Sequence, residues 1–351
     1  MFPKKVLVTG ANGYIGNAVA RAFSRAGWIT YGLVRSKAAA KALQLEEIIP
    51  VLGQIDDINS HQSILEQLPG TLDTIVSTTE NLENYIQHHQ NTIHLQRTIA
   101  LSSKENAKGA QPLVIISSGC KDYGPGPHYA GDKDLSPHTE ESPLNPPALL
   151  ANRTKLSLEA LKSNDDAFAA VVVRPTNVYG RSASYYGGFF NVASRAAQLK
   201  QPLYIPVPAA SICHALHVDD CGDAYVALAS HYGKRPEEIQ GEVFNISARA
   251  YETVDEISKA LVNEYSLPGV EYIEPGTEGQ YTENTWPPVL IDFPQWTGSD
   301  KIRRVTGWED VRPLFTESLH LYRLSYEAAV EEKHENVGKI KEREEAFRKG
   351  I

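Results

Sequence analysis

Short apolar segments alternate with longer amphipathic segments over the first 180 residues of the chain. Most of the apolar segments are continuous runs rich in β-branched residues, which is typical of strands covered on both faces in a parallel sheet. A helix is expected at residues 15–26, where apolar side chains recur at spacings of three and four. The runs predict six strands, at Lys5–Thr9, Ile29–Val34, Ile48–Leu52, Thr74–Ser77, Pro112–Ser117 and Ala169–Arg174.

This alternation of strand and helix predicts an α/β fold built on a doubly wound parallel Rossmann sheet. The pattern changes after Tyr179, where the chain becomes richer in loops, although Glu242–Ile246 still predicts a strand and Thr253–Glu264 a helix. We therefore expect a nucleotide-binding domain formed by residues 1–180 and about 214–250. A smaller intercalated substrate domain is expected from about 181–213 and 251–351.

The end of the chain differs in character from the rest. Residues from about 312 to 349 indicate helix, and residues 331–350 read EEKHENVGKIKEREEAFRKG, in which most side chains are charged. Such a segment is typical of a solvated helix or a mobile end. A helix that binds a partner is the alternative interpretation.

Composition narrows the function classes. The 351 residues carry 34 basic and 43 acidic side chains, a formal net charge of −9, which disfavours binding to a phosphate backbone. No apolar run approaches the roughly 20 residues needed to span a bilayer, and the first residues lack the pattern of a signal peptide. Cys120, Cys213 and Cys221 are scattered and odd in number. These features predict a cytoplasmic protein without a disulfide framework, and neither a nucleic-acid nor a membrane partner.

A glycine-rich turn carries the clearest chemical signal. Residues 6–16, VLVTGANGYIG, give a strand, a Gly-x-x-Gly-x-x-Gly turn and a helix start in that order. In this arrangement Gly10 permits the tight turn, Gly13 lets the backbone approach a pyrophosphate, and Gly16 lets the helix pack on the strand. The free N–H groups at the helix start then face the anion. The segment predicts a dinucleotide site.

The end of the second predicted strand indicates which dinucleotide is bound. An acidic residue there would accept a hydrogen bond from the ribose 2′-hydroxyl of NAD. The sequence instead has Arg35, Ser36 and Lys37. A guanidinium binds a phosphate in a bidentate manner, so NADP is expected in preference to NAD.

Several motifs together resemble those of the extended short-chain dehydrogenases/reductases, including the NAD-dependent epimerase/dehydratase group. They are the glycine turn, ISS at 116–118 followed by Tyr123-Gly124, RPTNVYG at 174–180, HVDD at 217–220, and residues 241–247. The resemblance implies a small-molecule carbonyl, hydroxyl or sugar-type substrate and often a homodimer. The cofactor site is expected to involve Gly10, Asn12, Gly13, Tyr14, Ile15, Gly16, Arg35, Lys37, Gln54, Ile55, Thr78, Lys155, Arg174, Pro175 and Asn177.

The catalytic signature departs from the family pattern. Members carry a Ser or Thr after the fifth strand and Tyr-x-x-x-Lys on the next helix, where a spacing of four places both side chains on one face. The ammonium lowers the pKa of the phenol, which then exchanges a proton with the substrate. Here Lys155 matches the lysine, Ala151 stands at the tyrosine position, and Ser118 is the candidate hydroxyl although the loop spacing is shifted by one residue.

The loop after the fifth strand offers substitutes for the missing phenol. His128 and Tyr129 follow a Gly-Pro-rich stretch at the sheet edge where ligands bind in this fold, so either could supply the proton. Surface positions for both are the alternative. The aromatic residues at 185–190 and the segment Glu278–Asp292 are expected around the substrate, with packing of the aromatics into the core as the alternative.

A cluster of histidine and aspartate at 214–220 has no spacing typical of a tetrahedral metal site, so no metal is expected. The resemblance instead makes Asp219-Asp220 a helix N-cap. Three function classes remain open. They are an NADP-dependent oxidoreductase or epimerase/dehydratase with an altered site, a non-redox isomerase, lyase or cyclase on the same fold, and a non-catalytic NADP-binding protein.

Replacing Gly13 by Val tests the glycine turn. The isopropyl group would occupy the space that the pyrophosphate needs, so the variant should stay folded and lose nucleotide binding. Circular dichroism and NADP titration of the two proteins measure this. Normal binding by Gly13→Val would show that the phosphate site lies elsewhere.

Overall fold

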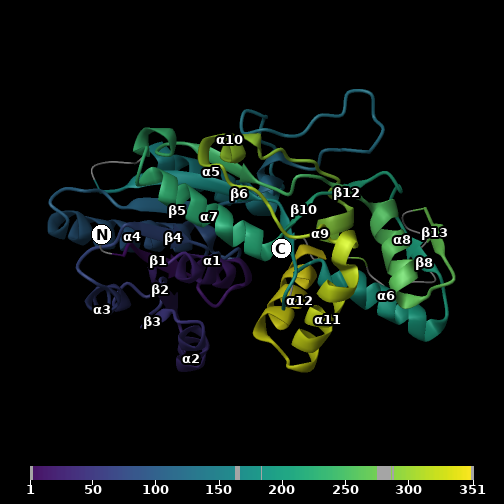
Figure 1. The fold of residues 1–351 in the computed structure, drawn as a ribbon, viewed down its shortest axis with the longest axis horizontal. Coiled ribbons are helices and arrows are strands. Elements are labelled where there is room, and N and C mark those ends of the chain that lie inside the picture. The colour runs from purple at the N-terminus through teal and green to yellow at the C-terminus, as the bar shows by residue number, and fades with distance from the viewer. Residues whose placement is uncertain (1–2, 163–166, 183, 275–285, 287, 349–351) are drawn as a thin grey trace.

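A seven-stranded parallel sheet forms the centre of the molecule in the computed structural model, which describes residues 3–162, 167–182, 184–274, 286 and 288–348 (Figure 1). The strand order is β11-β6-β5-β4-β1-β2-β3, with every neighbouring pair parallel. The strands are β1 (Lys5–Thr9), β2 (Ile29–Val34), β3 (Ile49–Leu52), β4 (Thr74–Ser77), β5 (Leu113–Ser117), β6 (Ala169–Pro175) and β11 (Val243–Ile246). The chain crosses from β3 back over β1 to β4, as a doubly wound sheet requires, so the predicted fold class is confirmed.

The predicted strands coincide with the observed ones to within one residue at each end. This agreement follows from burial, because the central strands β4 and β6 are buried at every position and consist of apolar or small side chains, with Arg174 near the end of β6 as the exception. Pro112 lies just before β5 and not within it. A proline has no N–H to donate to the neighbouring strand.

Helices cover both faces of the sheet. On one face α1 (Tyr14–Arg25), α2 (Lys37–Leu45), α7 (Val218–Tyr232) and α10 (Asp300–Thr306) bury residues such as Phe23, Leu43, Leu228 and Ile302. On the other face α3 (Ser60–Glu66), α4 (Tyr85–Asn106) and α5 (Ala151–Lys162) bury a second apolar layer. The two faces have separate cores, which is the three-layer arrangement of an α/β domain.

A second, smaller lobe lies beside the sheet (Figure 1). It contains α6 (Gly187–Leu199), α8 (Val254–Tyr265), α9 (Pro288–Ile291), α11 (Leu319–Glu331) and the paired strands β8 (Leu203–Ile205) with β13 (Val270–Tyr272) and β9 (Ile212–Cys213) with β12 (Glu252–Thr253). Its core is a distinct aromatic cluster that includes Tyr186, Phe189 and Phe315. The residue limits of the two domains stay a prediction, since α10 and Trp308 pack on the sheet.

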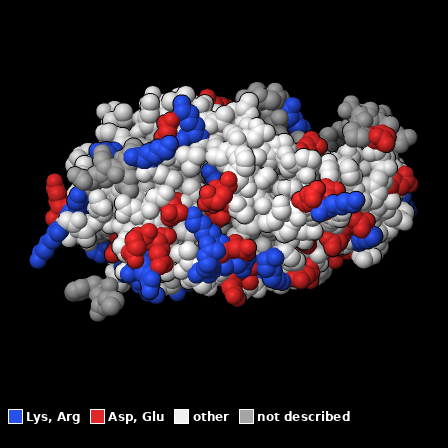
Figure 2. Space-filling view, turned by 90° about the horizontal axis from the view of Figure 1, so that it is seen from above, with Lys and Arg blue, Asp and Glu red and all other residues white. Residues whose placement is uncertain are grey.

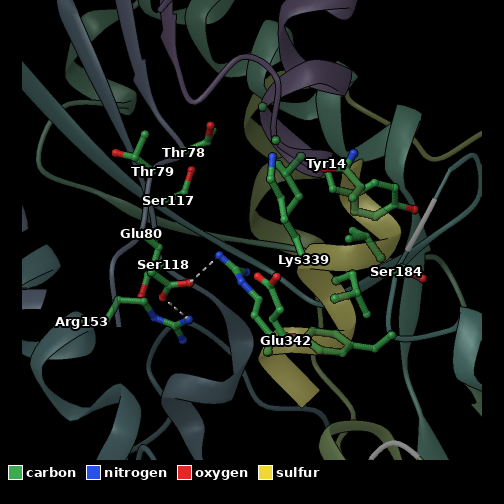
Figure 3. A pocket seen from close by; sticks show the side chains of 18 of the residues that line it. Tyr14, Thr78, Thr79, Glu80, Ser117, Ser118, Arg153, Ser184, Lys339 and Glu342 are labelled. Carbon is green, nitrogen blue, oxygen red and sulfur yellow. Dashed lines mark hydrogen bonds and ion pairs between the residues drawn. The ribbon is translucent and has the colours of Figure 1, made fainter. Parts of the chain in front are cut away.

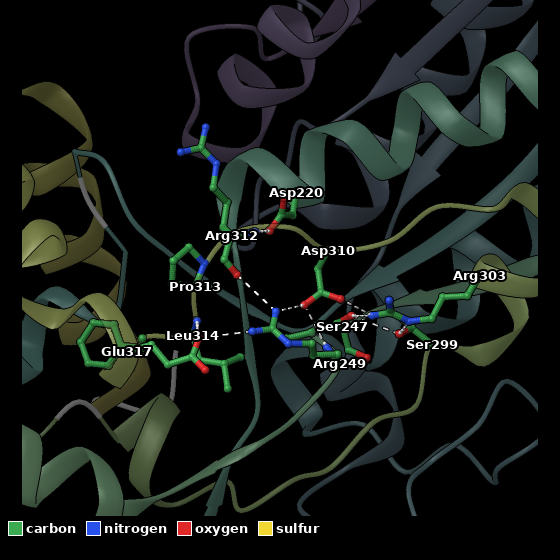
Figure 4. A network of polar contacts seen from close by, with 12 residues as sticks. Asp220, Ser247, Arg249, Ser299, Arg303, Asp310, Arg312, Pro313, Leu314 and Glu317 are labelled. Carbon is green, nitrogen blue, oxygen red and sulfur yellow. Dashed lines mark hydrogen bonds and ion pairs between the residues drawn. The ribbon is translucent and has the colours of Figure 1, made fainter.

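Buried carboxylates join the two lobes. Asp310 accepts hydrogen bonds from Arg303, at 2.6 Å, and from Arg249, at 3.2 Å, while Arg249 also reaches Glu317 (Figure 4). These contacts hold the chain after α10 against the end of β11. The lobes are therefore connected by charged groups that compensate one another, and such groups are stable when buried only in paired form.

Asp219 forms a second junction, at the start of α7. It accepts hydrogen bonds from Arg21 on α1, from Arg181 after β7 (Asn177–Tyr179), and from Arg312. His217, the last residue of β10 (Ala215–His217), is the N-cap of α7, since its Nδ1 accepts from the Asp219 amide at 3.1 Å. The expectation that Asp219 and Asp220 form the cap is wrong. Both lie in the first turn, and Asp219 links α7 to the helix of the glycine turn.

Basic and acidic side chains are interspersed on the face seen in Figure 2. No helix among the described residues is long and apolar enough to cross a membrane. The three cysteines are all buried with free thiols.

Candidate functional site

The glycine turn brings α1 unusually close to the sheet. Gly10 has φ of +69°, a conformation that glycine adopts without strain. A Cβ on Gly16 would lie 2.2 Å from the carbonyl oxygen of Gly10 and 2.5 Å from Oγ1 of Thr78, so only glycine fits there. Gly13 is the N-cap of α1 and faces a cavity, and the first turn of α1 contains no acidic side chain. The amide groups at this helix start are therefore available to an anion.

A cavity of about 370 Å³ opens at this turn (Figure 3). It is lined by the start of α1, by Arg35 at the end of β2, by residues 78–80 after β4, and by Ser117 and Ser118 at the end of β5. Residues of α12 (Glu335–Arg348) close it from the opposite side. The carboxyl ends of four parallel strands thus meet one helix N-terminus, the arrangement in which α/β sheets bind ligands.

Eight of the fifteen predicted cofactor residues line the cavity at the glycine turn or a second cavity beside it. Gly13, Tyr14, Ile15, Gly16, Arg35 and Thr78 line this cavity, and Pro175 and Asn177 line the adjoining one. Arg35 is exposed, and no partner of its guanidinium is found within the described part of the chain. Asn12 lines a smaller neighbouring cavity and donates from its amide to Glu335 at 3.0 Å.

Besides Gly10, Asn12 and Lys155, four more predicted cofactor residues do not line either cavity. Lys37 is an exposed residue that begins α2, and Gln54 is exposed beyond β3. Ile55 is buried in the apolar layer under α3 and α4. Arg174 is only 1% exposed and donates to Asp122, so its role is to compensate a buried charge.

A second cavity, of about 200 Å³, adjoins the first and shares seven of its lining residues, among them Ser118, Arg153 and Tyr185. It is also lined by residues 119–121 after β5, by residues 175–178 from the end of β6 to β7, by Leu82, Leu149 and Leu150, and by Val289 and Gln295. Because it lies on the side of the glycine turn opposite to Arg35, it is where the reacting end of a bound dinucleotide would meet a substrate.

Asp122 organises the wall between the two cavities. Its fully buried carboxylate accepts hydrogen bonds from Ser118 Oγ, from Thr154 Oγ1 at 2.8 Å, from Arg153 Nη2 at 2.8 Å and from Arg174 Nε at 3.1 Å. Ser118 therefore lies in the cleft, as predicted. Its hydroxyl donates to the carboxylate and keeps its oxygen lone pairs for another donor.

Helix α5 presents a different face to the cleft from the one expected. Ala151 and Lys155 share a face, as a spacing of four requires, but that face is turned to solvent. The Lys155 side chain is 71% exposed, and its ammonium lies 3.8 Å from Glu159. Arg153 lines the cavities instead and bridges Asp122 and Glu80. The prediction that Lys155 reaches the cleft is wrong. The ion pair between Arg153 and Asp122 places the face of α5 that carries Arg153 against the cleft instead.

The loop with His128 and Tyr129 is also placed away from both cavities. The His128 Nδ1 accepts from the Trp296 amide at 2.8 Å, and burial lowers the pKa of this imidazole. Tyr129 forms an isolated bridge with Ser211. Because the loop is held against the segments at 208–212 and 294–297, neither residue lines either cavity. This placement does not support the expectation that one of them supplies the proton.

Lys121 lines the second cavity, which we call the substrate-side cavity. Unlike the other basic residues of this lining, it has no carboxylate partner in the described part of the chain. It is partly buried, donates to the Val289 carbonyl at 2.7 Å, and lies 3.9 Å from the centre of the Phe293 ring. Burial, and then the guanidinium of Arg153, lower the pKa of Lys121 to about 7. An ammonium has three donors, so hydrogen bonding to Val289 leaves others for a ligand.

The aromatic residues at 185–190 divide between the two expected roles. Tyr185 lines both cavities, whereas Tyr186, Phe189 and Phe190 are buried in the core of the smaller lobe. Within the predicted segment Glu278–Asp292, residues 278–285 and 287 lie outside the described residues. Among the described residues, no group of three or more His, Cys, Asp or Glu is arranged to hold a metal ion.

Sequence reasoning missed several lining residues. Thr79 and Glu80 directly follow β4, and their place after a buried strand was an available signal. Arg153 and Lys121 carried no motif. The residues contributed by α12, such as Lys339 and Arg343, come from a segment expected to be solvated or mobile.

Comparison with known proteins gives a family match. The sequence profile described as the NAD dependent epimerase/dehydratase family matches residues 6–247. No curated protein matches the chain. Among solved structures, dTDP-glucose 4,6-dehydratase from Bacillus anthracis in complex with NAD is similar, with a TM-score of 0.67, 18% identity, and coverage of 93% of this chain and 97% of that one.

Two sugar-nucleotide epimerases have similar folds. UDP-glucose 4-epimerase from Thermotoga maritima, solved with UDP-glucose, has a TM-score of 0.65, 17% identity, and coverage of 93% of this chain and 99% of that one. The UDP-Glc/GlcNAc 4-epimerase from Campylobacter jejuni has a TM-score of 0.66, 20% identity, and coverage of 94% and 99%. At such identities the likeness concerns the fold.

The titration of Lys121 can be measured directly. Only the neutral amine reacts with acetic anhydride, and a lowered pKa means that the group is charged below about pH 7 and neutral above it. The acetylation rate of Lys121 should therefore reach half its maximum near pH 7. Mass spectrometry measures this rate, and the exposed Lys155 serves as an internal reference for the activity of the reagent. A midpoint above about pH 9, closer to that of an ordinary lysine, would contradict the environment described.

Proposed function

The chain belongs to the NAD dependent epimerase/dehydratase family, and from this membership we propose that it is an NADP-dependent enzyme that oxidises, reduces or epimerises a hydroxyl- or carbonyl-bearing substrate of sugar type. The observation that carries the proposal is the junction of the two cavities. One contains a glycine turn and Arg35, and the other contains Ser118 and Lys121.

The residues of the first cavity fit a dinucleotide. The absence of a Cβ at Gly13 leaves the start of α1 open to a pyrophosphate, and the absence of a Cβ at Gly16 lets this helix lie close against the turn. The exposed guanidinium of Arg35 would bind the 2′-phosphate of NADP, and no acidic side chain stands beside it to accept the 2′-hydroxyl of NAD. When bound, the nicotinamide supplies or accepts a hydride; the protein's contribution is to orient both partners and manage the proton.

Lys121 and Ser118 are the groups that we assign to substrate. In the absence of a phenol at position 151, the Lys121 ammonium would donate a proton to a substrate carbonyl oxygen, and the neutral amine would accept one from a hydroxyl in the reverse direction. A pKa of about 7 suits both directions. Ser118, whose hydroxyl proton is donated to Asp122, would accept a hydrogen bond from a hydroxyl group of the substrate.

The lining of the second cavity supports a small polar substrate. Besides Ser118 and Lys121, it includes the amides of Asn177 and Gln295. Several hydroxyl groups on one ring are the ligand chemistry that such donors and acceptors match. The proteins of similar fold named above act on UDP- or dTDP-linked sugars, and a sugar-type substrate is proposed here on that likeness together with the lining.

Non-redox chemistry is the second candidate. It is favoured by the combination of Ala151 with a solvent-facing Lys155, which removes the usual proton-transfer pair. An isomerase, lyase or cyclase would use the same Lys121 as acid or base, and a non-catalytic NADP-binding protein would use neither. We further propose a cytoplasmic location, in keeping with three free thiols, and a homodimeric state.

NADP should bind more tightly than NAD, because a charged hydrogen-bonded contact stabilises a complex by about 1.5–3 kcal/mol, equivalent to roughly ten- to a hundredfold in Kd. Replacement of Arg35 by Ala should remove this preference and leave NAD affinity unchanged. Isothermal titration of both dinucleotides with both proteins measures the effect, and Lys37→Ala is a matched control outside the cavity. Equal affinities in the wild-type protein would refute the preference.

Turnover tests the assignment of Lys121. With a panel of aldoses and ketoses, Lys121→Met should lower cofactor-linked absorbance change by about 10²–10⁴-fold, the usual contribution of a general acid or base, and leave NADP affinity unchanged. Reduction by the wild-type protein should fall as pH rises through about 7, where the ammonium is lost, and oxidation should fall as pH drops through the same value. Full turnover by Lys121→Met would remove this residue from the mechanism. Exchange of substrate isomers without cofactor absorbance change would favour the non-redox candidate.

A further inference from the structure

Helix α12, the charged segment at the end of the described chain, lies across the mouth of the cavity at the glycine turn (Figure 3). It follows α11 after a short turn in which Lys333 has φ of 52°. Among its described side chains, Val337 and Ile340 pack with Ala329 of α11, and the helix also contacts α9. Polar contacts in addition join it to the cleft.

Those polar contacts involve the residues that the dinucleotide site is built from. The side-chain amide of Asn12, in the glycine turn, donates to Glu335 Oε1 at 3.0 Å. The other oxygen of the same carboxylate lies 3.0 Å from the ammonium of Lys339, one helical turn further on. Arg343, a further turn along, lies 3.8 Å from Glu80 at the far end of the cavity.

Lys339 is thereby aimed at the phosphate end of the site. Its side chain extends from α12 into the cavity toward the start of α1, near Tyr14 (Figure 3). The start of α1 contributes unpaired amides and the positive end of a helix dipole, and it lacks an acidic residue in its first turn. A pyrophosphate between α1 and α12 would be bound by amides on one side and by an ammonium on the other.

We propose that Lys339 is a ligand of the cofactor's pyrophosphate and that α12 is a wall of the dinucleotide site, an inference that rests on the proposed function. Entry of the dinucleotide replaces the carboxylate of Glu335 by phosphate oxygens as the partner of the Lys339 ammonium. The half-exposed position of Glu335 allows its carboxylate to turn to water. Binding therefore draws α12 against the cleft.

Lys339 lines the cavity, whereas another lysine two positions further along α12 does not. Lys341 carries the same charge on the same helix, but it is exposed and does not line the cavity. It serves as the matched control for a general effect of charge on this segment. Arg35 serves as the control for the other phosphate, because NADP and NAD share the pyrophosphate and differ only at the 2′ position.

Calorimetric titration with NADP and with NAD tests the assignment. Lys339→Gln should weaken the binding of both dinucleotides by roughly ten- to a hundredfold, whereas Lys341→Gln should stay within about twofold of the wild-type protein. Lys339→Arg should recover most of the affinity. The loss should shrink as salt is raised, because a screened ammonium contributes less. Arg35→Ala, in contrast, should affect NADP alone.

Hydrogen exchange provides a readout that does not depend on the variants. Saturating NADP should slow amide exchange over residues 335–348 in the wild-type protein. Faster exchange there would mean that the cofactor displaces the helix, and would overturn the proposal.

Two outcomes distinguish the role of Lys339 from the proposed function. Unchanged dinucleotide affinity in Lys339→Gln, with normal binding by the wild-type protein, would refute the role of Lys339 and leave the proposed function standing. Failure of the wild-type protein to bind either dinucleotide would refute the proposed function and this inference with it.

Discussion

The buried carboxylate of Asp122 is the interaction on which the candidate site depends. It lies out of contact with water and accepts hydrogen bonds from two guanidinium groups, on α5 and β6, and from two hydroxyl groups, one just after β5 and one on α5. A buried charge is tolerated only when its partners are all in place, and removal of one partner of such a pair typically costs about 3–5 kcal/mol. Asp122 therefore fixes the hydroxyl of Ser118, the face of α5 and the wall between the two cavities at once.

That constraint gives a physical reason for the altered catalytic signature. Because Arg153 is bound to Asp122 and Glu80, the face of α5 that carries Ala151 and Lys155 is directed to solvent. The basic groups that line the substrate-side cavity then include Arg153 and the amine of Lys121, which follows β5. The guanidinium also helps to lower the pKa of that amine, so the two departures from the family pattern are coupled.

The glycine turn and α12 illustrate a second coupling, between a closely packed part of the fold and a helix that polar contacts join to it. Gly16 packs α1 on the sheet so closely that no side chain fits, which makes the start of this helix a fixed element. Helix α12 contacts α11 and α9 and is joined to the cleft by ion pairs and hydrogen bonds. A segment held in this way responds to the charge of whatever occupies the cleft.

The sequence by itself determined the sheet, the glycine turn and the position of Arg35 at the end of β2, because buried strands and tight turns are encoded by residues close together in the chain. Tertiary structure alone decided which face of α5 meets the cleft, where the His128 loop lies, and what α12 covers. Each of these depends on one contact between distant residues: Arg153 with Asp122 across 31 positions, Trp296 with His128 across 168, and Asn12 with Glu335 across 323. Local periodicity carries no information about such pairs, since the partners meet only when the sheet and the smaller lobe have assembled.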